Sequence, residues 1–248
     1  MKIIGRGLIA NALFPYSDQL EDVVIFASGV ADSTTTDSHE FEREYHLLYE
    51  TITACLKSQK RIVYFSSGGT VYGNYEGIRS ENTPLLPQTC YGRHKVLCEA
   101  IVRQSTLPYL IVRLPNLVGS MQNKTQLIPS LIHQARQGKV TLFQLATRDL
   151  VDVEDFAQIV VELLHNLSTS ETIVLASGYS ISIELIFDTI QEILNIPTQV
   201  ELLPKGDNQQ FSIDKLRSLI GDNHLPFHAE YYKQVITKYV DHIANLLP

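Results

Sequence analysis

Two side chains near the middle of the chain have the spacing of a proton-transfer pair. Tyr91 precedes Lys95 by four residues in the segment YGRHK, so on a helix both lie on one face. A neighbouring ammonium favours the ionised form of a phenol, whose pKa is about 10 when free, and brings it towards the operating pH. Such a phenol exchanges a proton with a hydroxyl or carbonyl group. The alternative is an ordinary amphipathic pair, because Tyr-x-x-x-Lys also arises by chance.

Hydroxyl groups follow a strand-like segment upstream of this pair. Residues 61–65, RIVYF, predict a strand that runs into Ser66-Ser67-Gly68-Gly69-Thr70. Ser67 and Thr70 are the candidates to hold a reacting oxygen by a hydrogen bond. The segment after them contains glycine and prolines and predicts a long loop, which in a compact domain is usually functional.

A glycine turn near the start of the chain is typical of phosphate binding. Residues 2–4 predict a short strand, followed by Gly5-Arg6-Gly7-Leu8-Ile9-Ala10 and a helix to about Phe14. Glycines let the backbone turn sharply and approach a pyrophosphate, and the helix start supplies free N–H groups. Alone this motif is a weak signal, because glycine turns after a first strand are common.

The elements that must position these residues alternate between strand and helix patterns. Strands are expected at residues 2–4, 23–27, 62–65, 109–112, 140–143 and 172–175, with helices between and after them. This alternation predicts an α/β fold with a doubly wound parallel sheet, which binds ligands at the carboxyl ends of its strands. Residues 5–10, 28–29, 66–69 and 114–119 each follow a strand, so we expect them to meet at one edge of the sheet.

For two helices, the sequence predicts both the capping residue and the residues that face the core. Ser38 is expected to cap a helix over residues 38–57, with an acidic start that suits the helix dipole. Its apolar face is expected to hold Phe41, Tyr45, Leu48, Ile52 and Cys55. Thr89 is expected to cap a helix over residues 90–104, with a buried stripe of Val96, Leu97, Ala100 and Ile101. Asp152 and Ser182 are expected to cap two later helices.

Composition excludes several classes of protein. The chain has 248 residues, enough for one α/β core with a small appended lobe, and a formal charge of −7 without a basic block, which argues against nucleic-acid binding. We expect no membrane insertion and no signal peptide, hence a cytoplasmic protein. Cys55, Cys90 and Cys98 show neither disulfide nor zinc-site spacing, so no metal is predicted.

Taken together, the motifs resemble a known enzyme family. GRGLIA, VVIFASG, RIVYFSSGGTVYG, YGRHKVLCE, RLPNLVG, RDLVDVED and SGYSISIELI fall in the order seen in extended short-chain dehydrogenases/reductases of the NAD-dependent epimerase/dehydratase family, which remodel nucleotide-linked sugars. The resemblance implies a Rossmann-like core of residues 1–114 plus 146–176, and a smaller, C-terminal substrate-binding lobe of residues 115–145 plus 177–248. It also implies a homodimer through the helices at 38–57 and 90–104.

The resemblance assigns roles to individual residues. Tyr91 would be the catalytic acid/base and Lys95 its partner on the cofactor ribose, assisted by Ser67 or Thr70. The residues implied in binding NAD or NADP are Gly5, Arg6, Gly7, Leu8, Ile9, Ala10, Ala27, Ser28, Gly29, Ser66, Tyr91, Lys95 and Pro115. Those implied in binding the nucleotide sugar are Ser67, Gly68, Thr70, Asn116 and Arg148. For Asn116 a loop turn, and for Arg148 a surface salt bridge, remain alternatives.

Three departures from the family pattern stand out. The glycine turn is one residue tighter and ends in Ala10. Gly68 occupies the position of the family's catalytic Ser or Thr, so the hydroxyl must come from elsewhere. The interval between the glycine turn and residue 61 is too short for the family's second and third strands, which removes the acidic residue that would bind the adenosine ribose. NAD or NADP therefore stays open, and Arg6 either faces a 2′-phosphate or points to solvent.

The sequence thus predicts an NAD(P)-dependent oxidoreductase or epimerase that transfers a hydride at a ring carbon of a nucleotide-activated sugar. One alternative is a one-way, NADPH-dependent reductase of keto-sugars. Another is a non-catalytic dinucleotide-binding sensor or scaffold, suggested by Gly68 and the missing strands. A dehydratase is disfavoured, because residues 68–70 supply no carboxylate beside the catalytic hydroxyl.

Overall fold

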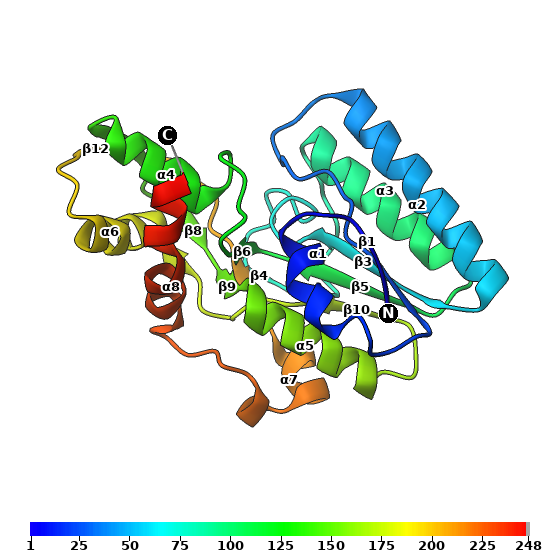
Figure 1. Cartoon of the computed structure of the whole chain (residues 1–248). Coiled ribbons are helices and arrows are strands. Elements are labelled where there is room, and N and C mark those ends of the chain that lie inside the picture. Colours follow the sequence, from blue (N-terminus) through cyan, green and yellow to red (C-terminus); the bar gives the residue numbers. More distant parts are fainter. Residues whose placement is uncertain (247–248) are drawn as a thin grey trace.

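The computed structural model describes residues 1–246 and is built around one parallel sheet (Figure 1). Its five strands lie in the order β1-β2-β3-β5-β10. Their bounds are Lys2–Ile4 for β1, Val23–Phe26 for β2, Arg61–Ser67 for β3, Tyr109–Leu114 for β5 and Glu171–Val174 for β10. β2 is buried along its whole length, as expected for a strand covered on both faces. The predicted α/β fold with a parallel sheet is confirmed.

Helices cover both faces of this sheet. On one face α1 (Leu8–Leu13) packs against α5 (Val153–Asn166), and on the other α2 (Ser38–Ser58) packs against α3 (Cys90–Gln104). Successive strand residues divide between the two sides, as strand geometry requires. Ile25 joins the hydrophobic cluster that contains Phe156 of α5, whereas Val24 joins the cluster that contains Leu48 of α2 and Cys98 of α3.

The first strand lies at the edge of the sheet. β1 pairs with β2 in parallel register, and within residues 1–246 no strand pairs with its other side. The connections β1–α1–β2 and β2–α2–β3 step along the sheet in the same direction but cross opposite faces, so they have opposite hands. Right-handed crossovers make up roughly 98% of such connections, so one of the two is of the rare hand. This arrangement agrees with the absence of two strands after α1.

The rest of the chain forms short two-stranded sheets and four helices, one of which (Asp214–Ile220) packs against α5 and β10 of the main sheet. The parallel pairs are β6 (Asn116–Val118) with β9 (Leu150–Asp152), β7 (Lys139–Phe143) with β12 (Gln199–Leu203), and β4 (Ile78–Arg79) with β13 (Gln210–Phe211). β8 (Thr147–Arg148) pairs with β11 (Ile181–Ser182) in antiparallel fashion. The helices are α4 (Leu127–Arg136), α6 (Ile183–Leu194), α7 (Asp214–Ile220) and α8 (Tyr231–Leu246). None of the helices in the described part of the chain is long and apolar enough to cross a membrane.

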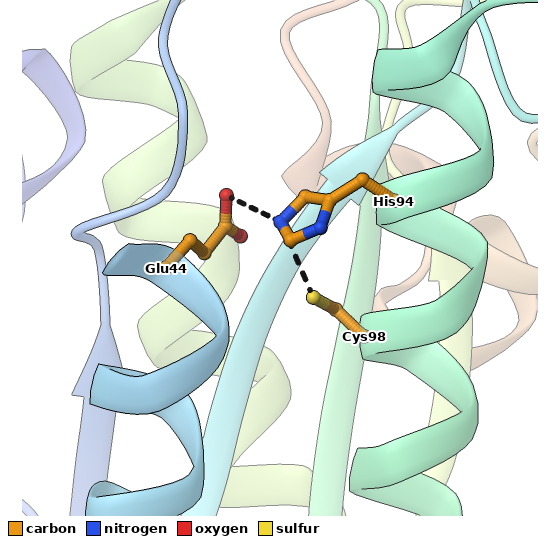
Figure 2. Close-up of side chains that lie close together, drawn as sticks. All are labelled: Glu44, His94 and Cys98. Carbon is orange, nitrogen blue, oxygen red and sulfur yellow. Dashed lines mark hydrogen bonds and ion pairs between the residues drawn. The ribbon is translucent and has the colours of Figure 1, made fainter. Parts of the chain in front are cut away.

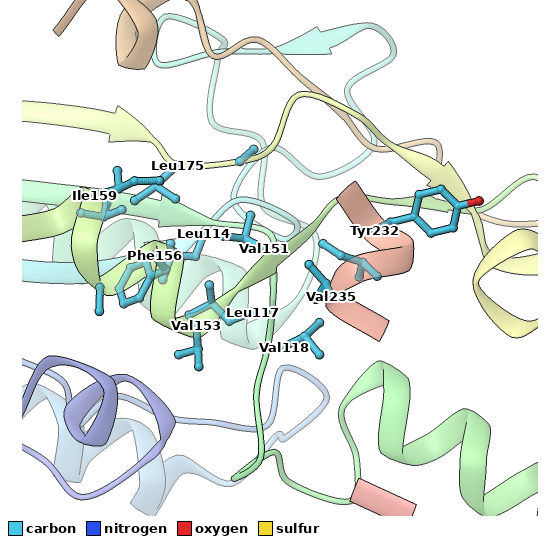
Figure 3. Close-up of a cluster of buried hydrophobic side chains, with 14 of the residues drawn as sticks. Leu114, Leu117, Val118, Val151, Val153, Phe156, Ile159, Leu175, Tyr232 and Val235 are labelled. Carbon is cyan, nitrogen blue, oxygen red and sulfur yellow. The ribbon is translucent and has the colours of Figure 1, made fainter. Parts of the chain in front are cut away.

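One hydrophobic cluster continues from the main sheet to these outer helices. Phe156 lies under the sheet, Leu117 and Val151 come from β6 and β9, and Tyr232 and Val235 come from α8 (Figure 3). The pair β6 and β9 therefore links the two parts of the chain through buried side chains.

Local sequence signals fix several helix starts. Thr89, Asp152 and Ser182 each accept a hydrogen bond from a backbone N–H of the helix that they precede, at 3.0, 2.8 and 3.1 Å. These three predictions are confirmed. The prediction for α2 is wrong by one residue, because Asp37 caps it by accepting from the His39 N–H at 2.9 Å, and Ser38 is already helical.

The predicted buried faces of α2 and α3 are only partly right. Leu48, Ile52 and Cys55 are buried, but Tyr45 and Leu97 are exposed. Half of the six buried positions on α3 are instead polar or charged: these positions are Gly92, His94, Lys95, Cys98, Glu99 and Val102. Apolar spacing alone misplaced this face, because the charges that make its burial favourable come from distant segments.

Candidate active site

A cleft of about 540 Å³ lies at the carboxyl ends of the sheet strands. The structure brings to it most of the residues singled out in the sequence. Those that line it are Arg6, Gly7, Leu8, Ile9, Ala27, Ser28, Gly29, Ser66, Ser67, Thr70, Tyr91, Lys95, Pro115, Asn116 and Arg148. The expected convergence of loops at one edge of a parallel sheet accounts for this assembly.

Three predicted site residues do not line the cleft. Gly5 has a φ of +137°, and a Cβ there would lie 2.2 Å from the Ala27 carbonyl oxygen, so this glycine permits close strand packing. Ala10 is buried in the hydrophobic core. The Gly68 N–H donates to the Leu114 carbonyl at 2.6 Å, and a Cβ would lie 3.0 Å from that carbonyl. These three residues thus pack behind the cleft, and their predicted roles in ligand binding stay predictions.

The glycine turn leaves open space where a phosphate would approach. A Cβ on Gly7 would meet no heavy atom within 4 Å, and Arg6 beside it is exposed. The first backbone N–H groups of a helix have no partner within that helix, and Leu8 and Ile9 at the start of α1 line the cleft. These features fit the pyrophosphate of a dinucleotide.

Tyr91 and Lys95 lie on one face of α3 as predicted, but their electrostatics differ from the prediction. The Lys95 Nζ lies 5.6 Å from the centre of the Tyr91 ring. Burial raises the pKa of the Tyr91 phenol, and Lys95 lowers it only in part, so that pKa lies above its ordinary value. The expected shift of the Tyr91 pKa towards neutral pH is therefore wrong in direction, because burial outweighs the effect of Lys95, whose ammonium is also paired with a carboxylate.

That carboxylate belongs to Glu44 of α2, which has no solvent exposure. Its Oε1 lies 2.9 Å from the Lys95 Nζ and accepts from the Tyr64 hydroxyl at 2.8 Å. Its Oε2 accepts from the Val30 N–H at 2.6 Å and lies 3.2 Å from the His94 Nε2. Burial raises the pKa of Glu44, but Lys95 and the hydrogen bonds lower that pKa by a larger amount, so the carboxylate is ionised. Its net pKa lies well below the usual range.

The two candidate hydroxyl groups differ in their hydrogen bonding. Ser67 Oγ accepts from the Thr70 N–H at 3.2 Å. Thr70 Oγ1 is buried and has no hydrogen-bond partner among the described residues, although Thr70 lines the cleft. A buried hydroxyl without a partner is costly, and a bound ligand oxygen would satisfy it.

Asn116 and Arg148 lie at the other side of the cleft. The Asn116 side chain donates to the Asp149 carbonyl at 3.3 Å, while one Arg148 nitrogen donates to the carbonyls of Thr147 and Asp207 at 2.7 and 3.0 Å. No salt bridge within residues 1–246 involves Arg148, so the surface salt bridge considered from sequence is not formed. Burial lowers the pKa of this guanidinium, which therefore favours an anionic ligand.

Sequence reasoning missed two residues of this region. Gln209, from the segment before β13, lines the cleft, and its amide would lie 3.3 Å from a Cβ on Gly69. Its Nε2 donates to Asp207 at 2.8 Å. Glu44 was predicted only as part of an acidic helix start. No local signal identifies either residue, because each is brought into place by contacts distant in sequence.

Comparison with known proteins now identifies the class of protein. The model of the NAD dependent epimerase/dehydratase family matches residues 10–176. The chain belongs to this family. The matched segment begins after the glycine turn, so it leaves out Gly5 and Gly7.

Individual relatives are distant. The chain is 27% identical over 150 residues to a dTDP-4-dehydro-6-deoxyglucose reductase of Escherichia coli, a match that covers 55% of this chain and 46% of that protein. It is 24% identical over 239 residues to a UDP-glucose 4-epimerase of Lactobacillus helveticus, covering 82% of this chain and 72% of that one. The match thus spans about half the length of the reductase.

A solved structure supports the fold. The structure of RMD from Pseudomonas aeruginosa complexed with NADPH superposes with a TM-score of 0.75 at 19% identity, covering 98% of this chain and 88% of that chain. At this level of identity the likeness concerns the fold alone.

Proposed function

We propose that the chain binds NAD or NADP in the cleft and acts on a nucleotide-activated sugar by hydride transfer at a ring carbon. The observation that carries this proposal is that Tyr91, Lys95 and the unpartnered Thr70 hydroxyl line the same cleft as the glycine turn. When bound, the nicotinamide would supply or accept the hydride. The residues 1–114 plus 146–176 would hold the cofactor, and residues 115–145 plus 177–248 the sugar nucleotide.

The protein residues then handle the proton and the positioning. Tyr91 gives a proton to the substrate oxygen or takes one from it, since its hydroxyl is the acid/base of the site. Lys95 donates to a ribose hydroxyl and stabilises charge on the phenol. Thr70 Oγ1 hydrogen-bonds the reacting oxygen in place of the side chain that Gly68 lacks.

The diphosphate of the substrate would be bound by Asn116 and Arg148. A guanidinium can form two parallel hydrogen bonds to phosphate oxygens, and an amide adds a neutral donor. Arg148 is suited to this role because its cleft position lacks a carboxylate partner within the described residues.

A second candidate function is one-way reduction of a keto-sugar with NADPH. The raised pKa of Tyr91 favours it, because a phenol that stays protonated is ready to donate to a carbonyl oxygen. Epimerisation requires the same group to take a proton first. Conversion of UDP- and dTDP-linked hydroxy-sugars and keto-sugars, tested with each cofactor, separates these two chemistries.

Tyr91→Phe tests the enzymatic proposal. Loss of the acid/base is expected to lower kcat by about 10²- to 10⁴-fold while leaving dinucleotide binding in place. Tyr109→Phe, at the start of β5 and so at the opposite end of the sheet, is the control and is expected to keep full activity. Dinucleotide binding without turnover of any sugar nucleotide would favour the sensor or scaffold instead.

Thr70→Val and Ser67→Ala test which hydroxyl serves the reaction. Thr70→Val keeps the side-chain shape and removes the unpartnered hydroxyl, so it is expected to lower kcat about 10-fold or more. Ser67→Ala is expected to have the smaller effect, because its Oγ is already engaged by the Thr70 N–H. The reverse ranking in steady-state kinetics would assign the role to Ser67.

We further propose that the chain forms a homodimer through α2 and α3. Large apolar side chains are exposed on these two helices at Tyr45, Tyr49, Leu56 and Leu97. Pairing them with a second copy would bury this surface in a four-helix bundle. Light scattering is expected to give a dimer for the wild type and a monomer for Leu97→Glu. A monomeric wild type would contradict the proposal.

A further inference from the structure

Glu44 of α2 and His94 and Cys98 of α3 form a buried cluster between the two helices (Figure 2). Their nearest ligand-type atoms lie within 4.8 Å of one another, a spacing that a metal ion could occupy. The hydrogen bonds indicate a different use. A carboxylate has about four acceptor positions, and Lys95, Tyr64, Val30 and His94 all approach Glu44 within hydrogen-bond or ion-pair distance. Glu44 is therefore saturated by protein groups.

We propose that Glu44 is a positioning residue that holds Lys95 in place and keeps the Tyr91–Lys95 pair fully protonated, so that Tyr91 starts the reaction as a proton donor. The proposal rests on the function proposed above. It also specifies which reaction is favoured, because a protonated Tyr91–Lys95 pair donates a proton to a carbonyl oxygen more readily than it takes one from a hydroxyl.

The Glu44 carboxylate lies close enough to the Lys95 ammonium to stabilise its charge. Lys95 is 3% exposed and Glu44 is fully buried, so their attraction at 2.9 Å acts in a medium of low dielectric constant. The Phe65 carbonyl also accepts from Lys95, at 3.4 Å. A Cβ on Gly29 would lie 2.7 Å from the Lys95 Nζ and 3.1 Å from Glu44, so the glycine makes room for the pair.

Glu44 also connects the pair to the loop that lines the cleft. Its bond to the Val30 N–H fixes the residue next to Gly29, and its contact with Tyr64 reaches the strand β3. Three segments that are far apart in the sequence thus converge on one carboxylate. Removal of Glu44 is expected to disturb Lys95 and this loop together.

The sign of the electrostatic effect follows from the groups around the pair. Tyr91 is influenced by Lys95, Glu44, Asp32 and Cys98, and Glu44 by Lys95 and the hydrogen bonds of His94 and Val30. Cys98 is a thiol, since burial raises its pKa to about 12. Removing the Glu44 charge makes loss of the first proton from the Tyr91–Lys95 pair easier, whichever member releases it.

Glu44→Gln tests the proposal in the cofactor-free protein. The pair is followed by tyrosine absorbance at 295 nm, with Tyr91→Phe as the subtraction, and by ¹⁵N spectra of labelled lysine, assigned with Lys95→Arg. In Glu44→Gln the first deprotonation of the pair is expected at least one pH unit lower than in the wild type. The basic limb of the pH–rate profile for carbonyl reduction is expected to shift in the same direction.

Glu99→Gln is the matched control. Glu99 is equally buried on α3, but it pairs with Arg113 at 2.8 Å and Arg103 at 2.7 Å. The Glu99→Gln variant therefore loses a buried ion pair that does not involve Lys95. It is expected to lose stability and keep the wild-type titration. A folded Glu44→Gln protein with unchanged titration, or an equal shift in Glu99→Gln, would overturn the proposal.

The wild type itself provides a test that does not depend on the folding of a variant. Its Lys95 signal is expected to stay in the ammonium form beyond pH 10.5 and Tyr91 to remain a phenol beyond pH 10, the usual values for these groups. Titration of either group below those values would overturn the role of Glu44. Because these measurements need no substrate, they separate failure of this inference from failure of the proposed enzyme activity.

Discussion

At the scale of single residues, Gly68 stands where the family resemblance led us to expect a serine or threonine. The Gly68 N–H donates to the Leu114 carbonyl, and a Cβ at residue 68 would lie 3.0 Å from that carbonyl, so a side chain there requires the neighbouring backbone to shift by a few tenths of an ångström. The hydroxyl expected there has not simply been lost, because Thr70 presents an unpartnered hydroxyl in the same cleft. Under the proposed function, Thr70 would donate the hydrogen bond two residues later in the chain.

Gly68→Ser is accordingly expected to damage the protein and not to improve it. A Cβ 3.0 Å from a backbone carbonyl forces a backbone shift, which typically costs about 1–3 kcal/mol in the free energy of unfolding. Urea unfolding measures this loss, and kcat is expected to fall or stay level. Gly7→Ala is the control for stability, because Gly7 has a φ of −83° and open space around its Cα. A gain of activity in Gly68→Ser would contradict this account.

At the scale of elements, the features predicted correctly from the sequence are those that depend on neighbouring residues. Thr89, Asp152 and Ser182 were found as helix caps because a cap depends on neighbours within one helical turn. The inner face of α3 was not found, since Lys95 and Glu99 are buried only because Glu44 and Arg113 reach them from other elements. Gln209 was missed for the same reason, as the pairing of β13 with β4 brings it to the cleft.

Asp149 joins two of these elements and makes a pH-dependent contribution to stability. It lies between β8 and β9, is fully buried, and accepts from the N–H groups of Ser177 and Gly178, which follow β10, at 2.8 and 2.9 Å. Burial raises its pKa from 3.8 to about 6, although the hydrogen bonds oppose the shift. A carboxyl whose pKa is raised on folding stabilises the protein below its unfolded pKa, and loses that contribution as the pH rises through the folded value.

Asp149→Asn is expected to remove this pH dependence. Between pH 4 and pH 7 the stability of the wild type relative to the variant is expected to fall by about 2 kcal/mol. The shift of roughly two pKa units is worth about 1.36 kcal/mol per unit, and part of it is already lost at pH 4. Taking the difference between the two proteins cancels Glu44 and Glu99, whose lowered pKa values act in the opposite direction. Urea unfolding across this range measures the difference, and a difference that stays constant would show that Asp149 ionises as in the unfolded chain.

At the scale of the whole molecule, the position of β1 is the feature with the largest consequence. In a full dinucleotide-binding sheet a further strand beside β1 ends in an acidic residue that binds the adenosine ribose. Here β1 is the edge, and in residues 1–246 no strand lies beyond it. The proposed function assigns Tyr91, Lys95 and Thr70 to the nicotinamide end of the cleft, and the glycine turn and residues 27–33, without a strand-end carboxylate, to the adenosine end.

This asymmetry predicts weak discrimination between NADH and NADPH. The sheet has no strand-end carboxylate to bind a 2′-hydroxyl or repel a 2′-phosphate, and Asp32 Oδ1 already accepts from the Thr34 N–H and hydroxyl. The two dissociation constants are therefore expected to agree within about 5-fold, or 1 kcal/mol. Nucleotide fluorescence titration of the purified chain measures both. If Arg6 reaches a 2′-phosphate, NADPH binds at least 10-fold more tightly and Arg6→Ala removes that preference, which would contradict the expectation of weak discrimination. A comparable preference for NADH would instead indicate that the ribose hydroxyls donate to Asp32, the only carboxylate among the described residues that line the cleft.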